Sequence, residues 1–236
     1  MSELTTLGHL LFVQSKKGYR HNIDSVLIAN FIRPKEDDSI LDVGSGDGII
    51  SIILKEKYPS LHITGIEIQE KLFKQSLKNS ELNKFNINFV NGDFFYHSFE
   101  KNSFDIILTN PPYYPLSCGK CSANNEKNLA KHEIAFNLEK FLKRSKTFLK
   151  NIGSIYFIYP ANRCYFAFNK ICENRLYIRR IRFVHSTISE NAVLVMYHLT
   201  NQQCKNFIIE KPLIIYEDKM NKVYTEEVKK YLFMEQ

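Results

Sequence analysis

The stretch Asp42-Val-Gly-Ser-Gly-Asp-Gly48 follows a short apolar run, Ser39–Val43, and precedes an amphipathic stretch, Ile49–Tyr58. Its glycines permit a tight turn and let the main chain approach a ligand closely at the start of the following helix. The spacing is not the G-x-G-x-x-G of a dinucleotide-binding turn, because Ile49 stands where the third glycine would be. The stretch therefore predicts a strand, a ligand-binding turn and a helix, and it leaves the ligand open.

Around this unit, short apolar runs alternate with amphipathic stretches, which is the pattern of βαβ units. The expected strands are 39–44, 62–68, 87–90, 104–109, 153–159, 180–184 and 192–199, and the expected helices are 49–58, 70–82, 138–149 and 163–174. Only a short loop separates the last two strands, so we expect them to pair antiparallel. The sequence predicts an α/β, Rossmann-like fold: a seven-stranded, mostly parallel sheet with helices on both faces.

We expect a single domain over residues 1–236, a length that buries about 70% of the unfolded surface. Within it we expect a short helical N-terminal extension over 1–38, whose helix lies around residues 24–32 and stops at Pro34, and a catalytic core over 39–200. A strand and an amphipathic helix are expected in the C-terminal extension, 201–236.

Composition excludes several classes of protein. Hydrophobic residues make up 44% of the chain and charged residues 24%, which is typical of a globular protein. The sequence has neither an apolar run near the roughly 18 residues of a membrane-spanning helix nor a basic leader, so we expect a cytoplasmic protein. Its five cysteines are expected to be reduced thiols. Cys118 and Cys121 lack the second ligand pair that zinc requires, so we predict no metal site.

The net charge of +7 is distributed unevenly along the chain. Residues 36–117 carry seven Lys or Arg and twelve Asp or Glu, whereas residues 118–236 carry twenty and eleven. Basic regions attract a polyanion through counterion release, although a solvated lysine-rich surface has the same composition. Charge alone therefore leaves a nucleic-acid partner and a solvated surface equally open.

Polar residues follow three further strands. Glu67 ends the second expected strand, Asn91-Gly-Asp93 follow the third, and Asn110-Pro-Pro-Tyr113 follow the fourth. Ligands bind outside the carboxyl ends of the strands in an open α/β sheet, so these residues and the glycine-rich turn should line one crevice. An acid in the position of Glu67 accepts ribose hydroxyls, in a nicotinamide enzyme as in other nucleoside-binding proteins.

Four strand-end motifs in this order resemble the class I S-adenosylmethionine-dependent methyltransferases. The resemblance implies S-adenosylmethionine as the cofactor, with its methionine part at the glycine-rich turn, its ribose at Glu67 and its adenine amine at Asp93. The cofactor-binding residues that it implies are Asp42, Gly44, Ser45, Gly46, Glu67, Ile68, Asp93, Phe94 and Asn110. The catalytic residues that it implies, around the target nitrogen, are Asn110, Pro111, Pro112 and Tyr113.

The Asn-Pro-Pro-Tyr segment suits transfer to an exocyclic amine, whose lone pair is delocalised into the base. The side-chain oxygen of Asn110 and the carbonyl of Pro111 would accept its two N–H bonds, so that the nitrogen becomes pyramidal and its lone pair faces the methyl donor. The prolines fix the turn, and Tyr113 offers a face for stacking worth about 1–3 kcal/mol per base. The mechanism requires neither a metal ion nor a covalent intermediate.

Nearly the whole chain is similar to the small bacterial enzymes that methylate N6 of adenine 37 in the anticodon loop of valine tRNA. The similar segments are 22–29, 66–70, 110–115, 131–133, 180–184, 211–216 and 224–228. The similarity implies a tRNA partner, whose loop adenine is already unpaired and is therefore easily flipped. The predicted RNA-binding residues are Lys16, Lys17, Arg20, Lys131, Arg175, Arg179, Arg180 and Arg182, and Lys131 replaces an arginine that is usual in that family.

Several alternatives stay open. The same motif serves enzymes that act on adenine N6 or guanine N2 of rRNA, or on a glutamine of release factors. The release-factor enzymes carry a sizeable helical domain before the glycine-rich strand, and only 38 residues precede Ser39 here. A non-catalytic RNA-binding module and a nicotinamide-dependent oxidoreductase are alternatives of other classes. The oligomeric state and the roles of Cys118, Cys121 and His132 are not predicted.

Overall fold

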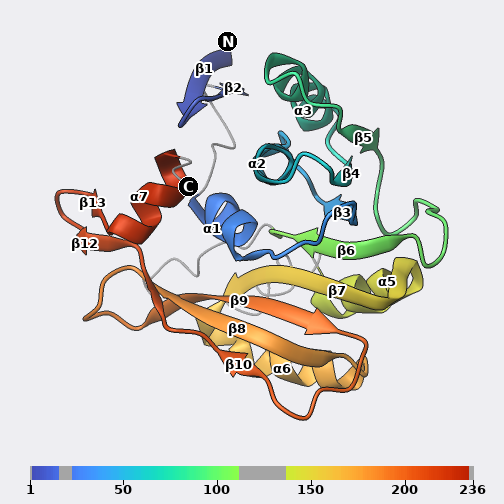
Figure 1. Cartoon of the computed structure of the whole chain (residues 1–236). Helices are drawn as coiled ribbons and strands as arrows, with labels where there is room; N and C mark the ends of the chain where they lie inside the picture. Colours follow the sequence, from blue (N-terminus) through green and yellow to red (C-terminus); the bar gives the residue numbers. More distant parts are fainter. Residues whose placement is uncertain (1, 16–22, 112–136, 234–236) are drawn as a thin grey trace, which may run out of the picture.

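A mixed sheet forms the centre of the computed structural model, which describes residues 2–15, 23–111 and 137–233. The strands run in the order β5-β4-β3-β6-β7-β9-β8-β10, and β11 also pairs with β8 (Figure 1). They are β3 (Ser39–Val43), β4 (His62–Glu67), β5 (Asn88–Asn91), β6 (Phe104–Thr109), β7 (Leu149–Pro160), β8 (Tyr177–His185), β9 (Ala192–Thr200), β10 (Ile208–Ile209) and β11 (Leu213–Ile214). All seven expected strands are present, and β10 and β11 extend one side of the sheet.

Strand direction and register bring the carboxyl ends of most strands to one edge. β3, β4, β5, β6 and β7 pair in parallel, and β9 lies antiparallel between β7 and β8, as expected for the last two strands. Val43 lies opposite both Ile66 and Thr109, and Pro160 lies opposite Leu194. We call the edge where β3, β4, β6, β7 and β8 end the carboxyl edge, and the opposite one the amino edge.

Helices cover both faces of the sheet, as predicted. The helices are α1 (Ile23–Phe31), α2 (Ile49–Lys57), α3 (Glu70–Leu82), α5 (Leu138–Phe148), α6 (Cys164–Glu173), α7 (Glu226–Phe233) and the 3-10 helix η1 (Ala161–Arg163). In Figure 1, α1, α2 and α3 lie on one side of the sheet, and α5 and α6 lie on the other. Each face has its own apolar cluster, the first including Ile28, Ile53 and Val228 and the second Phe141 and Ile171.

In the described part of the N-terminal extension, α1 is the only helix. Residues before it form an antiparallel hairpin of β1 (Ser2–Leu7) and β2 (Leu10–Ser15) instead. Side chains of α3 complete the backbone hydrogen bonds of β2: Asn83 Oδ1 accepts from Leu11 N at 3.0 Å, and Asn79 Oδ1 accepts from Val13 N at 2.7 Å. The helix expected around residues 24–32 is present as α1. The hairpin was not predicted, because the side chains that complete the hydrogen bonds of β2 lie more than sixty residues further along the chain.

The C-terminal extension contains the expected strand and helix, β11 and α7, and also a small hairpin. β12 (Tyr216–Asp218) pairs with β13 (Val223–Tyr224), and α7 packs beside α1. Figure 1 shows the hairpin and α7 near the carboxyl edge. None of the helices in the described ranges is long and apolar enough to span a membrane.

Candidate active site

The glycine-rich turn connects β3 to α2 at the carboxyl edge. Gly44, Gly46 and Gly48 all have positive φ angles, of 70°, 59° and 87°, which other residues adopt only with strain. The N–H groups of Gly44 and Ser45 donate to the carbonyl of Ile66 at 2.9 and 3.1 Å, which fixes the turn against β4. A Cβ added to Gly44 would meet no atom within 4 Å. Open space therefore lies beside the main chain where a ligand is expected.

Glu67 presents an oriented carboxylate beside this turn. Only 5% of the residue is exposed. Its Oε2 accepts from Gly46 N at 2.9 Å, and its Oε1 accepts from Gln69 N at 2.8 Å. Each carboxylate oxygen retains a further acceptor position, so the group fits a pair of hydroxyls. The adjacent Ile68 is 62% exposed and offers an apolar surface at the same edge.

Asp42 is buried completely at the end of β3. Ser51 Oγ donates to its Oδ2 at 2.7 Å, and its Oδ1 has no hydrogen-bond partner within the described part of the chain. Burial, with a smaller contribution from the nearby Glu67, raises the pKa of this carboxyl, the bond from Ser51 opposes the rise, and the resulting pKa is about 7. The predicted cofactor residue Ser45 is also buried, and its Cβ lies close to Gly65.

Asp93 lies on a tight turn that follows β5. Its Oδ1 accepts from Phe95 N at 2.8 Å, and Arg144 from α5 donates to the carbonyls of Phe94 and His97 at 2.7 and 2.6 Å. Arg144, which the sequence analysis did not single out, thus fixes the segment that carries Asp93. The ring of Phe94 is buried on the face of α5, so only its main chain is left for a cofactor contact.

Asn110 follows β6 and is held by α1. Thr109 Oγ1 donates to the carbonyl of Val43 at 2.8 Å, and Asn110 Nδ2 donates to Ser25 Oγ at 2.9 Å. Because the amide nitrogen is bonded to α1, the amide oxygen is directed away from that helix. Ser25 was not predicted as a site residue, and its only signal in the sequence is a serine at the start of an apolar run within the expected helix. The structure shows that this serine is buried. Pro111 is buried, and Pro112 and Tyr113 lie outside the described residues.

Two predicted RNA-binding residues, Arg180 and Arg182, are structural instead. Arg180 is 4% exposed, binds Glu210 Oε1 at 2.8 Å and donates to the carbonyl of Phe31 at 2.6 Å. Arg182 donates both terminal nitrogens to Glu227 at 2.7 and 2.8 Å. The prediction was wrong for both, because the C-terminal extension covers this face of β8 and supplies their carboxylates.

Arg175 and Arg179 are exposed but lie near the amino edge. Tyr177, between them, is the first residue of β8 and pairs with Thr200, the last residue of β9. Their predicted position near the crevice was therefore wrong. The other predicted RNA-binding residues, Lys16, Lys17, Arg20 and Lys131, lie outside the described residues, as do His132, Cys118 and Cys121. The described ranges hold no cluster of three or more His, Cys, Asp or Glu suited to a metal ion.

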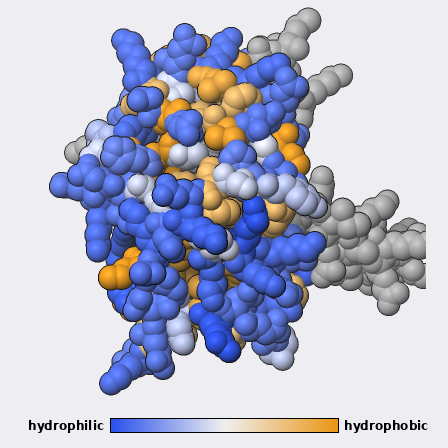
Figure 2. Space-filling view, turned by 90° about the vertical axis from the view of Figure 1, so that its right-hand side faces the viewer, coloured by the Kyte–Doolittle hydropathy of each residue, from blue (hydrophilic) through white to orange (hydrophobic). Residues whose placement is uncertain are grey.

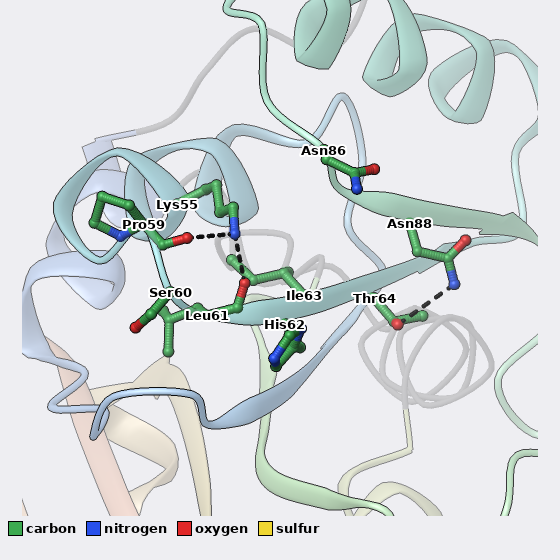
Figure 3. Close-up of a pocket in the computed structure, with 9 residues that line it drawn as sticks. All are labelled: Lys55, Pro59, Ser60, Leu61, His62, Ile63, Thr64, Asn86 and Asn88. Atoms are coloured by element: carbon green, nitrogen blue, oxygen red, sulfur yellow. Dashed lines mark hydrogen bonds between the residues drawn. The ribbon is translucent and has the colours of Figure 1, made fainter.

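A groove of about 400 Å³ lies at the amino edge, away from the strand-end motifs (Figure 3). It is lined by Lys55, Pro59, Ser60, Leu61, His62, Ile63, Thr64, Asn86 and Asn88. The Lys55 ammonium donates to the carbonyls of Pro59 and Leu61 at 2.6 and 2.7 Å, so it already has two hydrogen-bond acceptors within the protein. Figure 2 shows this side of the molecule as mostly hydrophilic, with apolar residues gathered in its upper half. The groove forms no part of the candidate site.

Known proteins are similar to this chain in both sequence and fold. A family model described as a methyltransferase domain matches residues 34–228. A relative from Glaesserella parasuis, named tRNA1(Val) (adenine(37)-N6)-methyltransferase, is 32% identical over 143 residues, which cover 60% of this chain and 59% of the relative. A Fusobacterium nucleatum protein, named release factor glutamine methyltransferase, is 41% identical over 83 residues, 35% of this chain and 23% of that protein. The chain thus aligns with less than two thirds of the length of either relative.

The solved structure of a predicted O-methyltransferase from Agrobacterium tumefaciens superposes with a TM-score of 0.69 at 14% identity. The superposition covers 88% of this chain and 94% of that chain, and at this identity it shows the fold alone. It confirms the predicted Rossmann-like methyltransferase fold. With the family model matched over most of the chain, the conclusion is that the chain belongs to the methyltransferase-domain family.

Proposed function

We propose that the protein transfers the methyl group of S-adenosylmethionine to N6 of an unpaired adenine in tRNA, with adenine 37 of valine tRNA as the target. The observation that carries the proposal is the Asn110 amide, held by Ser25 at the end of β6 beside three strand ends that fit a nucleoside cofactor. The name of the Glaesserella parasuis relative supports the choice of tRNA. We also propose a cytoplasmic location, where this substrate is found.

The residues at the carboxyl edge fit the cofactor part by part. The open space beside Gly44 admits the methionine part, the Glu67 carboxylate accepts the ribose hydroxyls, and Asp93 accepts from the adenine amine. When bound, S-adenosylmethionine supplies an electrophilic methyl group on a good leaving group. Positioning therefore supplies most of the rate, and the chain has only to align the acceptor nitrogen with that methyl group.

Asn110 would align the acceptor. With Nδ2 bonded to Ser25, the Asn110 oxygen and the Pro111 carbonyl accept the two N–H bonds of the adenine amine. This arrangement favours a pyramidal nitrogen and directs its lone pair toward the methyl donor. After transfer the nitrogen is positively charged and strongly acidic, so it loses a proton to water without a dedicated base.

The proposal is tested by methyl transfer from radiolabelled S-adenosylmethionine to total tRNA, rRNA and protein, followed by digestion to nucleosides and amino acids. We expect label in N6-methyladenosine from the tRNA fraction. Label in rRNA or in glutamine would assign the same fold to another substrate. Cofactor binding with no transfer to any fraction would favour the RNA-binding module and overturn the proposal.

The Asn110→Ala substitution tests the role of the amide. We expect transfer to fall by about 100-fold or more, the scale seen when one oriented polar group is lost from a reaction centre. The affinity for S-adenosylmethionine, measured by calorimetry, should stay within about twofold, because Glu67 and the glycine-rich turn are untouched. Transfer at the wild-type rate would remove Asn110 from the mechanism.

A further inference from the structure

Arg163 has an environment unlike that of the other arginines on the sheet. It ends η1, directly after β7 at the carboxyl edge, and its guanidinium lies 5.6 Å from the ring centre of Tyr159 and 4.9 Å from that of Phe166. Two aromatic faces therefore hold the planar group in place through cation–π contacts. Among the described residues it has neither a carboxylate partner nor a hydrogen-bond acceptor.

Three other arginines have hydrogen-bond acceptors of the kind that Arg163 lacks among the described residues. Arg144 donates to two carbonyls, Arg180 to a carboxylate and a carbonyl, and Arg182 to both oxygens of one carboxylate. A guanidinium has five N–H donors in a fixed fork that matches a carboxylate or a phosphate. Within ranges 2–15, 23–111 and 137–233, aromatic rings alone contact the fork of Arg163, which leaves its donors for an anion from outside these residues.

Arg163 also lies beside the reaction centre proposed above. β7 is the direct neighbour of β6, and Phe157 lies opposite Thr109. Adjacent strands are about 4.8 Å apart, so the segment that follows Pro160 flanks the segment that follows Thr109. Two residues beyond Arg163, Tyr165 in the first turn of α6 is 77% exposed. A fixed cation and an exposed aromatic ring thus lie next to the place where the target base would enter.

We propose that Arg163 and Tyr165 bind the RNA beside the target nucleotide, with the guanidinium on a backbone phosphate and the Tyr165 ring against a flanking base. The inference rests on the proposed function and specifies its substrate contacts. An arginine fork binds phosphate in a bidentate manner, and an exposed ring stacks on any base. This surface replaces the one that the sequence predicted around Arg180 and Arg182, whose donors are bonded within the protein.

The test measures binding of the full chain to an unmodified valine tRNA transcript at several salt concentrations. Arg163→Met keeps the aliphatic contact with the rings and removes the charge. We expect about tenfold weaker binding and a salt slope reduced by about 0.7–0.9, the value of one phosphate contact. Tyr165→Ala should weaken binding about tenfold and Tyr165→Phe should not, because stacking requires only the ring. Lys205→Met, at an exposed residue beyond β9 near the amino edge, is the charge-matched control and should change binding less than twofold.

The outcomes separate this inference from the proposed function. Calorimetry with S-adenosylmethionine checks that each variant retains the wild-type cofactor affinity and therefore its fold. If the wild type methylates tRNA and Arg163→Met binds tRNA as well as Lys205→Met does, the inference is wrong and the proposed function stands. Weaker binding by Arg175→Met than by Arg163→Met would likewise overturn it and restore the amino-edge surface. If Arg163→Met weakens RNA binding but no RNA is methylated, the inference stands and the proposed function fails.

Discussion

Asp42 shows how one buried carboxyl group links the candidate site to stability. In the folded protein burial raises the pKa of Asp42 to about 7, whereas in the unfolded chain an aspartate has its ordinary value near 4. Between these values the folded protein holds a proton that the unfolded chain has released. The free energy of unfolding therefore falls as the pH rises from about 4 to 7, and the loss is complete above pH 7.

The Asp42→Asn substitution should remove this pH dependence. An amide keeps an oxygen that accepts from Ser51 but does not ionise, so the variant should gain stability over the wild type as the pH rises. The gain should be on the order of a few kcal/mol at neutral pH. Urea denaturation of the cofactor-free protein at pH 4.5, 6 and 7.5 measures it. Parallel stability curves for the two proteins would contradict the explanation.

At the scale of elements, α3 joins the N-terminal hairpin to the glycine-rich turn. Asn79 is buried completely, and while its Oδ1 accepts from Val13 N, its Nδ2 donates to the carbonyl of Asp47 at 2.9 Å. Asn83, one helical turn later, binds both backbone groups of Leu11 and makes no bond to the turn. Both amides therefore hold β2 against α3, but only that of Asn79 also contacts the glycine-rich turn.

Asn79→Ala and Asn83→Ala form a matched pair of variants. Both should lower the free energy of unfolding by about 1–3 kcal/mol, because each leaves backbone groups of β2 unsatisfied. Asn79→Ala alone also frees the Asp47 carbonyl, so it should weaken S-adenosylmethionine binding severalfold more than Asn83→Ala does. Calorimetric titration of both variants gives the comparison. Equal cofactor affinities would show that the Asn79 bond does not position the turn.

Across the whole molecule, the two edges of the sheet have different roles. The carboxyl edge carries Asn110, Glu67 and the glycine-rich turn, while the amino edge carries the groove around Lys55. Because strand direction places every strand-end motif at one edge, the other edge is distant from the reaction. A His62→Ala substitution in the groove should therefore leave kcat/KM for methyl transfer within about twofold of wild type. A larger loss in a variant of unchanged stability would assign the groove a part in the reaction.

The parts of the structure that could be predicted from the sequence are those whose interacting residues lie close together along the chain. The strand-end motifs were located correctly because each follows its own strand and parallel pairing aligns the strand ends. The hairpin β1–β2 was missed because its hydrogen-bond partners, Asn79 and Asn83, are distant in sequence. Arg180 was misplaced for the same reason, since alternation along β8 does not show that Glu210 approaches it. The environment of Arg163 could not be predicted either, because the sequence does not show which side chains surround its guanidinium. In the described part of the structure these are the rings of Tyr159 and Phe166.

We expect Glu210 to fix the order in which parts of the chain mature during translation. Its Oε1 lies 2.8 Å from both Arg33, just beyond α1, and Arg180 on β8. While the ribosome is still adding residues 181–209, the Arg180 guanidinium has no carboxylate to balance its charge, and burying it alone is unfavourable. The contact of β8 with α1 is therefore completed only after Glu210 has left the exit tunnel. In the newly made protein, the contact between the C-terminal extension and α1 is therefore expected to form last.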